Sequence, residues 1–202
     1  MTARRRTNDH DHDMVIVCRG TEPNDIAADA NALTDLAETV GRVHRGFKRE
    51  VDDIWPELEE SLRDEKRNVW FSGHLLGAAT AQICAIRCQL SDIAAVPQEV
   101  VTFGSPRVGT KQYIKNLTVT HLRWVNNNDI VTRVPPRWFR YRHTGTRRYL
   151  DSKGDGKKCN PAQRGRDRWA GSWAGLKQRQ FHHFSDHAIA VSVSHIRRAA
   201  HG

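Results

Sequence analysis

Short apolar runs are the clearest pattern along the chain, and they predict the strands of a sheet. Four runs, at residues 14–18, 69–71, 100–103 and 122–125, are predicted to be strands, and the first is an unbroken apolar run that suits a strand buried on both faces. Each run ends in a turn rich in glycine, asparagine or serine. The chain therefore contains at least four strands of a buried sheet.

Between these runs, apolar residues recur at the spacing of an α-helix. Apolar residues recur at a period near 3.6 over 45–63, at Phe47, Val51, Ile54, Leu58 and Leu62. A second helix is predicted from Leu76 to Leu90, with small residues where it lies close to the sheet, and a short helix over 111–115. A final helix is expected from about residue 186.

This alternation predicts the α/β class, with a mostly parallel central sheet and helices on both faces. Ligands of such sheets bind at the carboxyl ends of the strands, where the glycine- and asparagine-rich turns fall. We expect one domain over 1–202, with 1–13 flexible and 151–180 forming a long surface excursion.

The charge is unevenly distributed. Of 32 Lys+Arg and 23 Asp+Glu, residues 1–136 hold 17 and 19, while residues 137–202 hold 15 and 4. The net charge of +9 therefore belongs to the second part, at +11 against −2. Such a basic surface suits peripheral contact with lipid interfaces or another polyanion. No recognised binding motif supports nucleic acid as the partner, although aromatic residues accompany the basic ones.

Several classes of protein are excluded on composition. The longest apolar run, residues 14–18, is far shorter than a membrane-spanning helix, and residues 1–6 lead into polar residues rather than a signal core. We therefore expect no transmembrane segment and a cytoplasmic location, or a secreted one if a signal was removed. The four cysteines lack a CxxC pair and are interpreted as packing thiols rather than metal ligands.

One segment has the context of a nucleophile elbow, the sharp strand–turn–helix that exposes a catalytic side chain. Gly73-His74-Leu75-Leu76-Gly77 follows a predicted strand and opens a predicted helix, with glycine at both flanks. Asp129 after a later strand and His187 near the end follow in the chain order of α/β-hydrolases. Leucine stands where such an elbow carries serine.

From Val15 to about Ile196 the sequence resembles the class 3 lipase family, whose members resemble fungal lipases. The motifs that carry the resemblance are residues 15–21, 43–47, 73–77, 102–109, Val125-Asn126 with 129–131 and Pro135, 143–145 and 186–187. Their order along the chain is that of the family.

The resemblance implies an α/β-hydrolase fold, here shortened at the N-terminus, and hydrolysis of carboxylic esters such as acylglycerols without metal or cofactor. It assigns the triad acid to Asp129, the triad histidine to His187 and the nucleophile position to Leu75. The oxyanion hole falls on the backbone N–H groups of Thr21 and Leu76, and a lid on residues 24–33.

Leu75 has no atom that can attack a carbonyl, so the form written here is expected to be inactive. Three accounts remain open: an inactivating change in a working enzyme, a natural pseudoenzyme that binds lipid or a partner, and a sequencing or cloning error. The strained backbone of an elbow costs of order 1–3 kcal/mol and is normally tolerated for function. A lineage of working hydrolases is the preferred interpretation.

Other interpretations of these residues stay open. Ser72 or Ser105 would have to replace the missing nucleophile, or Asp129 and His187 would have to activate water directly, more slowly. Asp129 could cap a turn, and His187 could begin a helix. His182 and His183 with His187 could form a metal pair, and His74 is interpreted as a packing residue.

Overall fold

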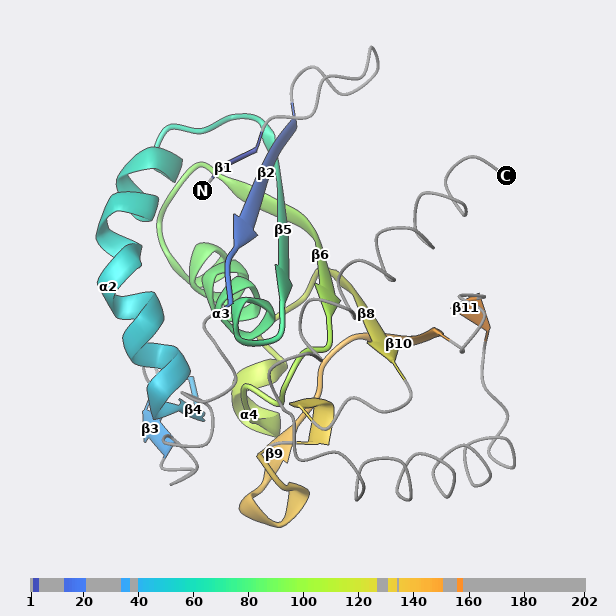
Figure 1. The fold of residues 1–202 in the computed structure, drawn as a ribbon. Helices are drawn as coiled ribbons and strands as arrows, with labels where there is room; N and C mark the ends of the chain where they lie inside the picture. The colour runs from blue at the N-terminus through green and yellow to red at the C-terminus, as the bar shows by residue number, and fades with distance from the viewer. Residues whose placement is uncertain are drawn as a thin grey trace. The chain divides into compact units, whose positions relative to one another are not determined.

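Four parallel strands form the centre of the fold. The computed structural model describes residues 2–3, 13–20, 34–36, 40–126, 131–133, 135–150 and 156–157. Antiparallel β1 borders the parallel strands, in the order β1-β2-β5-β6-β8. Their bounds are Thr2–Ala3 (β1), Asp13–Cys18 (β2), Asn68–His74 (β5), Val96–Phe103 (β6) and Thr120–Asn126 (β8) (Figure 1). The α/β-hydrolase fold and its mostly parallel sheet are confirmed.

The strand register brings three carboxyl ends to one edge of the sheet. Strand β2 pairs with β5 up to Cys18↔Gly73, and β5 pairs with β6 up to His74↔Phe103. The turns that follow β2, β5 and β6 therefore lie at that edge, where parallel sheets bind their ligands.

Helices α2 (Arg45–Leu62) and α3 (Leu76–Leu90) pack against each other, and α3 covers β2, β5 and β6. Every residue of α3 from Leu76 to Cys88 is buried. The predicted core face of α2 needs one correction, because Ile54 is 43% exposed and Trp55 is buried beside it. At the end of α3, Leu90 is exposed as well, so the apolar spacing overestimates how far the core extends.

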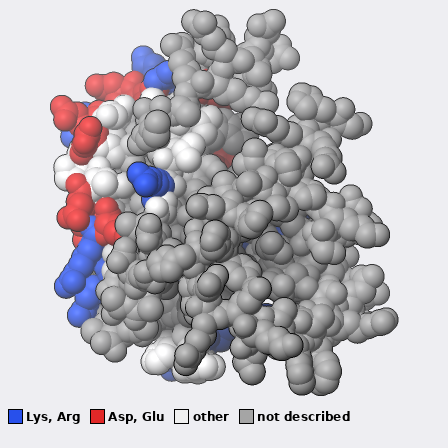
Figure 2. Space-filling view, viewed as in Figure 1, with Lys and Arg blue, Asp and Glu red and all other residues white. Residues whose placement is uncertain are grey.

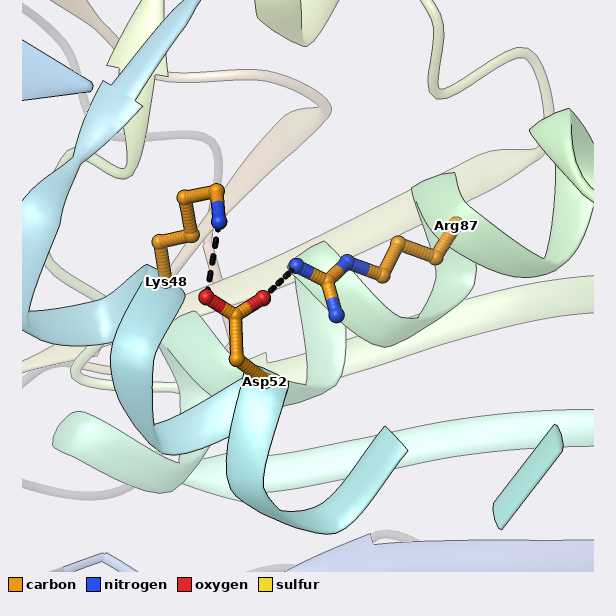
Figure 3. A network of polar contacts seen from close by, with 3 residues as sticks. All are labelled: Lys48, Asp52 and Arg87. Carbon is orange, nitrogen blue, oxygen red and sulfur yellow. Dashed lines mark hydrogen bonds and ion pairs between the residues drawn. The ribbon is translucent and has the colours of Figure 1, made fainter. Parts of the chain in front are cut away.

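A polar link joins the two helices (Figure 3). Lys48 Nζ donates a 2.7 Å hydrogen bond to Asp52 Oδ2, and the buried guanidinium of Arg87, from α3, donates to Oδ1. Burial opposes the charge on Asp52, but these two donors outweigh it and lower the pKa of the carboxyl below its ordinary value. Arg87 also lies over the ring of Trp55, 5.7 Å from its centroid. The link fixes α3 against α2.

A second, antiparallel sheet has the order β3-β4-β7-β9 and was not predicted. Its strands are Thr34–Leu36 (β3), Arg42–His44 (β4), Gly109–Thr110 (β7) and Tyr141–Arg142 (β9). Strands of two or three residues are too short for a hydrophobic period. Around them are α4 (Lys111–Ile114), the helix predicted at 111–115, and the short 3₁₀ helices η1 (Val131–Arg133) and η2 (Arg137–Phe139).

The chain divides into two compact units, Met1–Trp124 with Ile130–Arg147, and Val125–Asp129 with Arg148–Gly202. Strand β10 (Thr146–Leu150) runs from the first unit into the second, where its end pairs antiparallel with β11 (Gly156–Lys157) at Tyr149↔Lys157. The rest of the predicted excursion over 151–180, and the predicted final helix, lie outside the described residues.

Charges of both signs mark the helical side of the first unit. Figure 2 shows acidic and basic side chains side by side at the left of the view, where Figure 1 places α2. In the part of the chain that the structure describes, no helix is long and apolar enough to cross a membrane.

Candidate active site

The backbone at Leu75 has the sharp turn of an elbow. Strand β5 ends at His74, α3 begins at Leu76, and Leu75 between them has φ 51° and ψ −116°. A positive φ in a leucine is a genuine outlier, because its Cβ crowds the neighbouring backbone. The conformation costs of order 1–3 kcal/mol, so the surrounding structure must hold it in place.

Two backbone hydrogen bonds hold this residue. The N–H of Leu75 donates to the carbonyl oxygen of Phe103 at the end of β6 (3.0 Å), and the carbonyl of Leu75 accepts from the N–H of Ala78 (3.1 Å). One bond ties the turn to the neighbouring strand, and the other ties it to the first turn of α3. Residue 75 is thereby fixed at the carboxyl edge of the sheet.

The flanking glycines permit a backbone approach that no side chain would allow. A Cβ at Gly73 would lie 2.1 Å from the carbonyl oxygen of Gly77, and a Cβ at Gly77 would lie 2.2 Å from that of Cys18. A Cβ at Gly20, just after β2, would lie 2.7 Å from the carbonyl oxygen of His74. The strand end, the turn and the helix start are therefore in direct backbone contact.

The N-terminus of α3 forms one wall of the site. The N–H groups of Leu76 and Gly77 lie at the positive end of the helix dipole, a position that favours negative charge. Gly20 lies against the same helix end, since its Cβ would be 3.2 Å from the nitrogen of Gly77 and 3.5 Å from that of Leu76. The residue after Gly20 is Thr21, which lies outside the described residues.

Of the alternative side chains near the turn, Ser105 is held by contacts of its own. Ser105 is buried, accepts a 2.5 Å hydrogen bond from Gln82 Nε2 and donates to the carbonyl oxygen of Pro106 (3.0 Å). Ser72 lies within β5, three residues before the turn. His74 is partly buried, and burial lowers the pKa of its imidazole.

The remaining predicted site residues lie outside the described residues: Thr21, Asp129, His187, the predicted lid 24–33, and His182 and His183. Within the described ranges, no three His, Cys, Asp or Glu side chains are grouped to hold a metal ion.

Two buried basic residues on β8 and a partly buried histidine after β9 form a cluster that was not predicted. His121 and Arg123 are 3% and 7% exposed on β8, and His143 follows β9. His121 Nε2 lies 2.8 Å from Thr102 Oγ1, and His143 Nε2–H donates to the carbonyl oxygen of Thr132 (2.9 Å). The Nδ1 atoms of both histidines and Nε of Arg123 have no hydrogen-bond partner among the described residues. Charged side chains in a strand rarely predict burial, so the sequence did not predict that His121 and Arg123 are buried.

Both histidines are held neutral. Burial, and after it the nearby Arg123, lowers the pKa of His121 and of His143 to about 3, from 6.5. Below pH 6.5 the unfolded chain therefore binds protons that the folded chain refuses. We expect the free energy of unfolding to fall by about 1.4 kcal/mol per pH unit and per histidine as pH decreases toward 3. Urea unfolding at several pH values measures the slope, and His143→Gln should make it shallower. An unchanged slope would show that His143 already titrates freely.

The strain at residue 75 predicts that glycine is more stable than alanine at this position, the reverse of the usual order. Glycine normally destabilises relative to alanine, but at φ 51° glycine adopts the conformation without a Cβ clash. Leu75→Gly should therefore be more stable than Leu75→Ala by about 1 kcal/mol. Thermal unfolding of the two variants measures the difference. The ordinary order, with alanine the more stable, would mean that the turn relaxes.

Solved structures define the class of protein. The chain superimposes on a solved structure of a triacylglycerol lipase, whose title states that a serine protease triad forms its catalytic centre, with a TM-score of 0.61 and 26% identity. The match covers 74% of this chain and 60% of that one. The architecture is thus that of the α/β-hydrolases with lipase relatives.

Sequence comparison identifies the family. The family model of class 3 lipases matches residues 15–139, and the chain belongs to that family. It is 31% identical over 114 residues to a lipase of Rhizomucor miehei, covering 52% of this chain and 31% of that protein. It is 33% identical over 118 residues to the toxin TseL of Vibrio cholerae, covering 56% and 18%. The chain therefore spans less than a third of the length of these two relatives.

Proposed function

We propose that this chain derives from a carboxylic-ester hydrolase acting on acylglycerol-type or short-chain esters, in a form inactivated at Leu75. The observation that carries the proposal is the backbone of Leu75, with φ 51° and ψ −116°. This strained turn has a use when its side chain is a nucleophile and little use otherwise. The lipases and phospholipases among the relatives support an ester substrate.

The proposed machinery is a triad with residue 75 as its nucleophile position. A serine there would attack the ester carbonyl while His187 takes its proton and Asp129 orients the imidazole. His187 would then protonate the leaving alcohol, and water would release the acid from the acyl-enzyme. The isobutyl group of Leu75 has neither a lone pair nor a proton to transfer. The reaction therefore cannot take its first step.

The proposed oxyanion hole uses the backbone N–H groups of Leu76 and Thr21. The position of Leu76 at the start of α3 supports its role, because helix polarity favours negative charge there. The approach of Gly20 to this helix end supports a role for Thr21, the next residue. No metal or cofactor enters the proposed reaction.

A second candidate is a natural pseudoenzyme that binds lipid or a partner protein. The leucine itself favours it, since a half-buried apolar side chain at residue 75 would fill part of a substrate cleft. Under this proposal the hydrolase fold is kept for binding. That the whole chain 1–202 forms one domain is part of both proposals.

The test restores the nucleophile and then removes its partners. Leu75→Ser should hydrolyse p-nitrophenyl esters, and a series of acyl lengths would define the preferred chain. Adding Asp129→Asn or His187→Gln to the Leu75→Ser background should abolish most of the gain. Activity that survives both second changes would exclude the proposed triad. No gain from Leu75→Ser at any acyl length would favour the pseudoenzyme.

A further inference from the structure

Two neighbouring aromatic side chains stand out from the surface of the first unit. Trp138 and Phe139, in η2, are 80% and 51% exposed, with their ring centroids 6.3 Å apart. The other large apolar side chains described as exposed are aliphatic and stand singly along the chain. Adjacent exposed aromatic rings are costly in water and mark surfaces that meet an apolar phase or a partner.

The backbone around this pair is held by several hydrogen bonds. The N–H of Phe139 donates to the carbonyl oxygen of Pro136 (3.2 Å), and the N–H of Arg140 donates to that of Arg137 (3.0 Å). Arg142 Nη1 donates to the same Arg137 carbonyl (3.0 Å). The aromatic pair is thus presented on a well-bonded turn.

Arg140 ends this turn in a left-handed conformation. Its φ is 66° and its ψ 6°, a region that glycine or asparagine adopts more readily than arginine. A chain that only had to close this turn would gain from glycine at 140. The strained arginine is therefore a sign that its charge is used.

The surroundings of the pair are cationic. Residues 130–150 contain six arginines and no acidic residue. An open cleft beside η2, of about 490 Å³, is lined by Arg42, Lys111, Arg140 and Arg142 among others. Among the described residues, Arg137 and Arg140 have no carboxylate partner.

We propose that the Trp138–Phe139 turn, with Arg137 and Arg140 beside it, is a docking surface for the face of an anionic lipid membrane. The aromatic rings would enter the region between headgroups and acyl chains, where amphipathic rings reside, and the arginines would bind the lipid phosphates. A polyanion without an apolar layer would use the arginines but leave both rings in water. The proposal deepens the proposed ester-hydrolase function, since it gives the lipid substrate's surface a place to bind.

The test uses the chain as written, because it should bind lipid without consuming it. We expect co-sedimentation with vesicles of phosphatidylcholine mixed with phosphatidylglycerol, and much less with phosphatidylcholine alone. Trp138→Ser with Phe139→Ser should weaken binding at least about tenfold. Arg137→Gln and Arg140→Gly should each weaken binding to the anionic vesicles about fivefold. Arg140→Gly should also keep or raise the thermal stability, because it relieves a positive φ.

Matched controls come from α2, where Ile54 is 43% exposed and Arg49 is exposed. Ile54→Ser and Arg49→Gln should leave vesicle binding unchanged. Equal binding to both vesicle types, or equal losses in the α2 controls, would overturn the proposal. So would unchanged binding of the aromatic double variant, which would indicate a polyanion surface.

The experiments distinguish a failure of the proposed function from a failure of the proposed docking surface. Hydrolysis of dissolved short-chain esters by Leu75→Ser needs no interface. Vesicle binding without such hydrolysis would therefore contradict only the function, and hydrolysis without vesicle binding would contradict only the docking surface.

Discussion

Serine at position 75 is expected to raise the rate of ester hydrolysis by on the order of 10⁴- to 10⁶-fold over the chain as written. The expectation rests on geometry already present: residue 75 is fixed by hydrogen bonds to Phe103 and Ala78 at the start of α3. The side chain of serine is smaller than that of leucine, so the substitution needs no rearrangement of the turn. Hydrolysis of a soluble p-nitrophenyl ester measures the gain.

Leu75→Ala is the matched control for this gain. It removes the leucine side chain to the same extent but supplies no hydroxyl, so it should hydrolyse esters no faster than the chain as written. A comparable rise in Leu75→Ala would mean that opening the cleft, rather than nucleophilic attack, limits the rate.

The glycines of the elbow should tolerate no side chain. Gly73→Ala would put a Cβ 2.1 Å from the carbonyl oxygen of Gly77, and Gly77→Ala would put one 2.2 Å from that of Cys18. Both obstacles are backbone atoms of buried elements and cannot rotate away. We expect each change to lower the free energy of unfolding by at least about 3 kcal/mol. Urea unfolding followed by circular dichroism measures the loss.

Gly46→Ala provides the comparison, because Gly46 lies in the first turn of α2. Alanine there should be neutral or stabilising by up to about 1 kcal/mol, from helix propensity. If Gly73→Ala and Gly77→Ala change the free energy of unfolding no more than Gly46→Ala does, the close backbone contacts at Gly73 and Gly77 are contradicted.

The sequence predicts the elements whose pattern is local, namely the strands of the central sheet and the elbow between β5 and α3. Residues 14–18 and 69–71 are continuous apolar runs, as expected of parallel strands. Val17 is nevertheless 40% exposed, so β2 is not covered on both faces. The runs of β6 and β8 are interrupted by Thr102 and Arg123. The elbow is predicted because glycine at 73 and 77 leaves few other interpretations between a strand and a helix. Every residue of α3 from Leu76 to Cys88 is buried, so the apolar spacing of this helix carries little information about which face meets the sheet.

Other features depend on contacts between distant segments. Strands β7 and β9 have two residues each, and their pairing at Gly109↔Arg142 joins segments more than thirty residues apart. His121 and Arg123 are buried although their polarity favours exposure. Thr102 and Gly145 lie against His121, and His143 is near enough to feel the charge of Arg123. Trp138 and Phe139 are the reverse case, because both are exposed although aromatic side chains normally pack in the core. Tertiary contacts decide both cases.

The most direct test of the central claim is covalent labelling of the restored nucleophile. A fluorophosphonate ester reacts when a serine oxygen displaces fluoride at phosphorus, and the adduct mimics the tetrahedral intermediate in the oxyanion hole. Intact-mass measurement and fragmentation of the labelled peptide from the Leu75→Ser variant should find one adduct, on residue 75 itself, and none on the chain as written. An unlabelled variant, or an adduct on Ser72 or Ser105, would contradict the assignment of residue 75 as the nucleophile position.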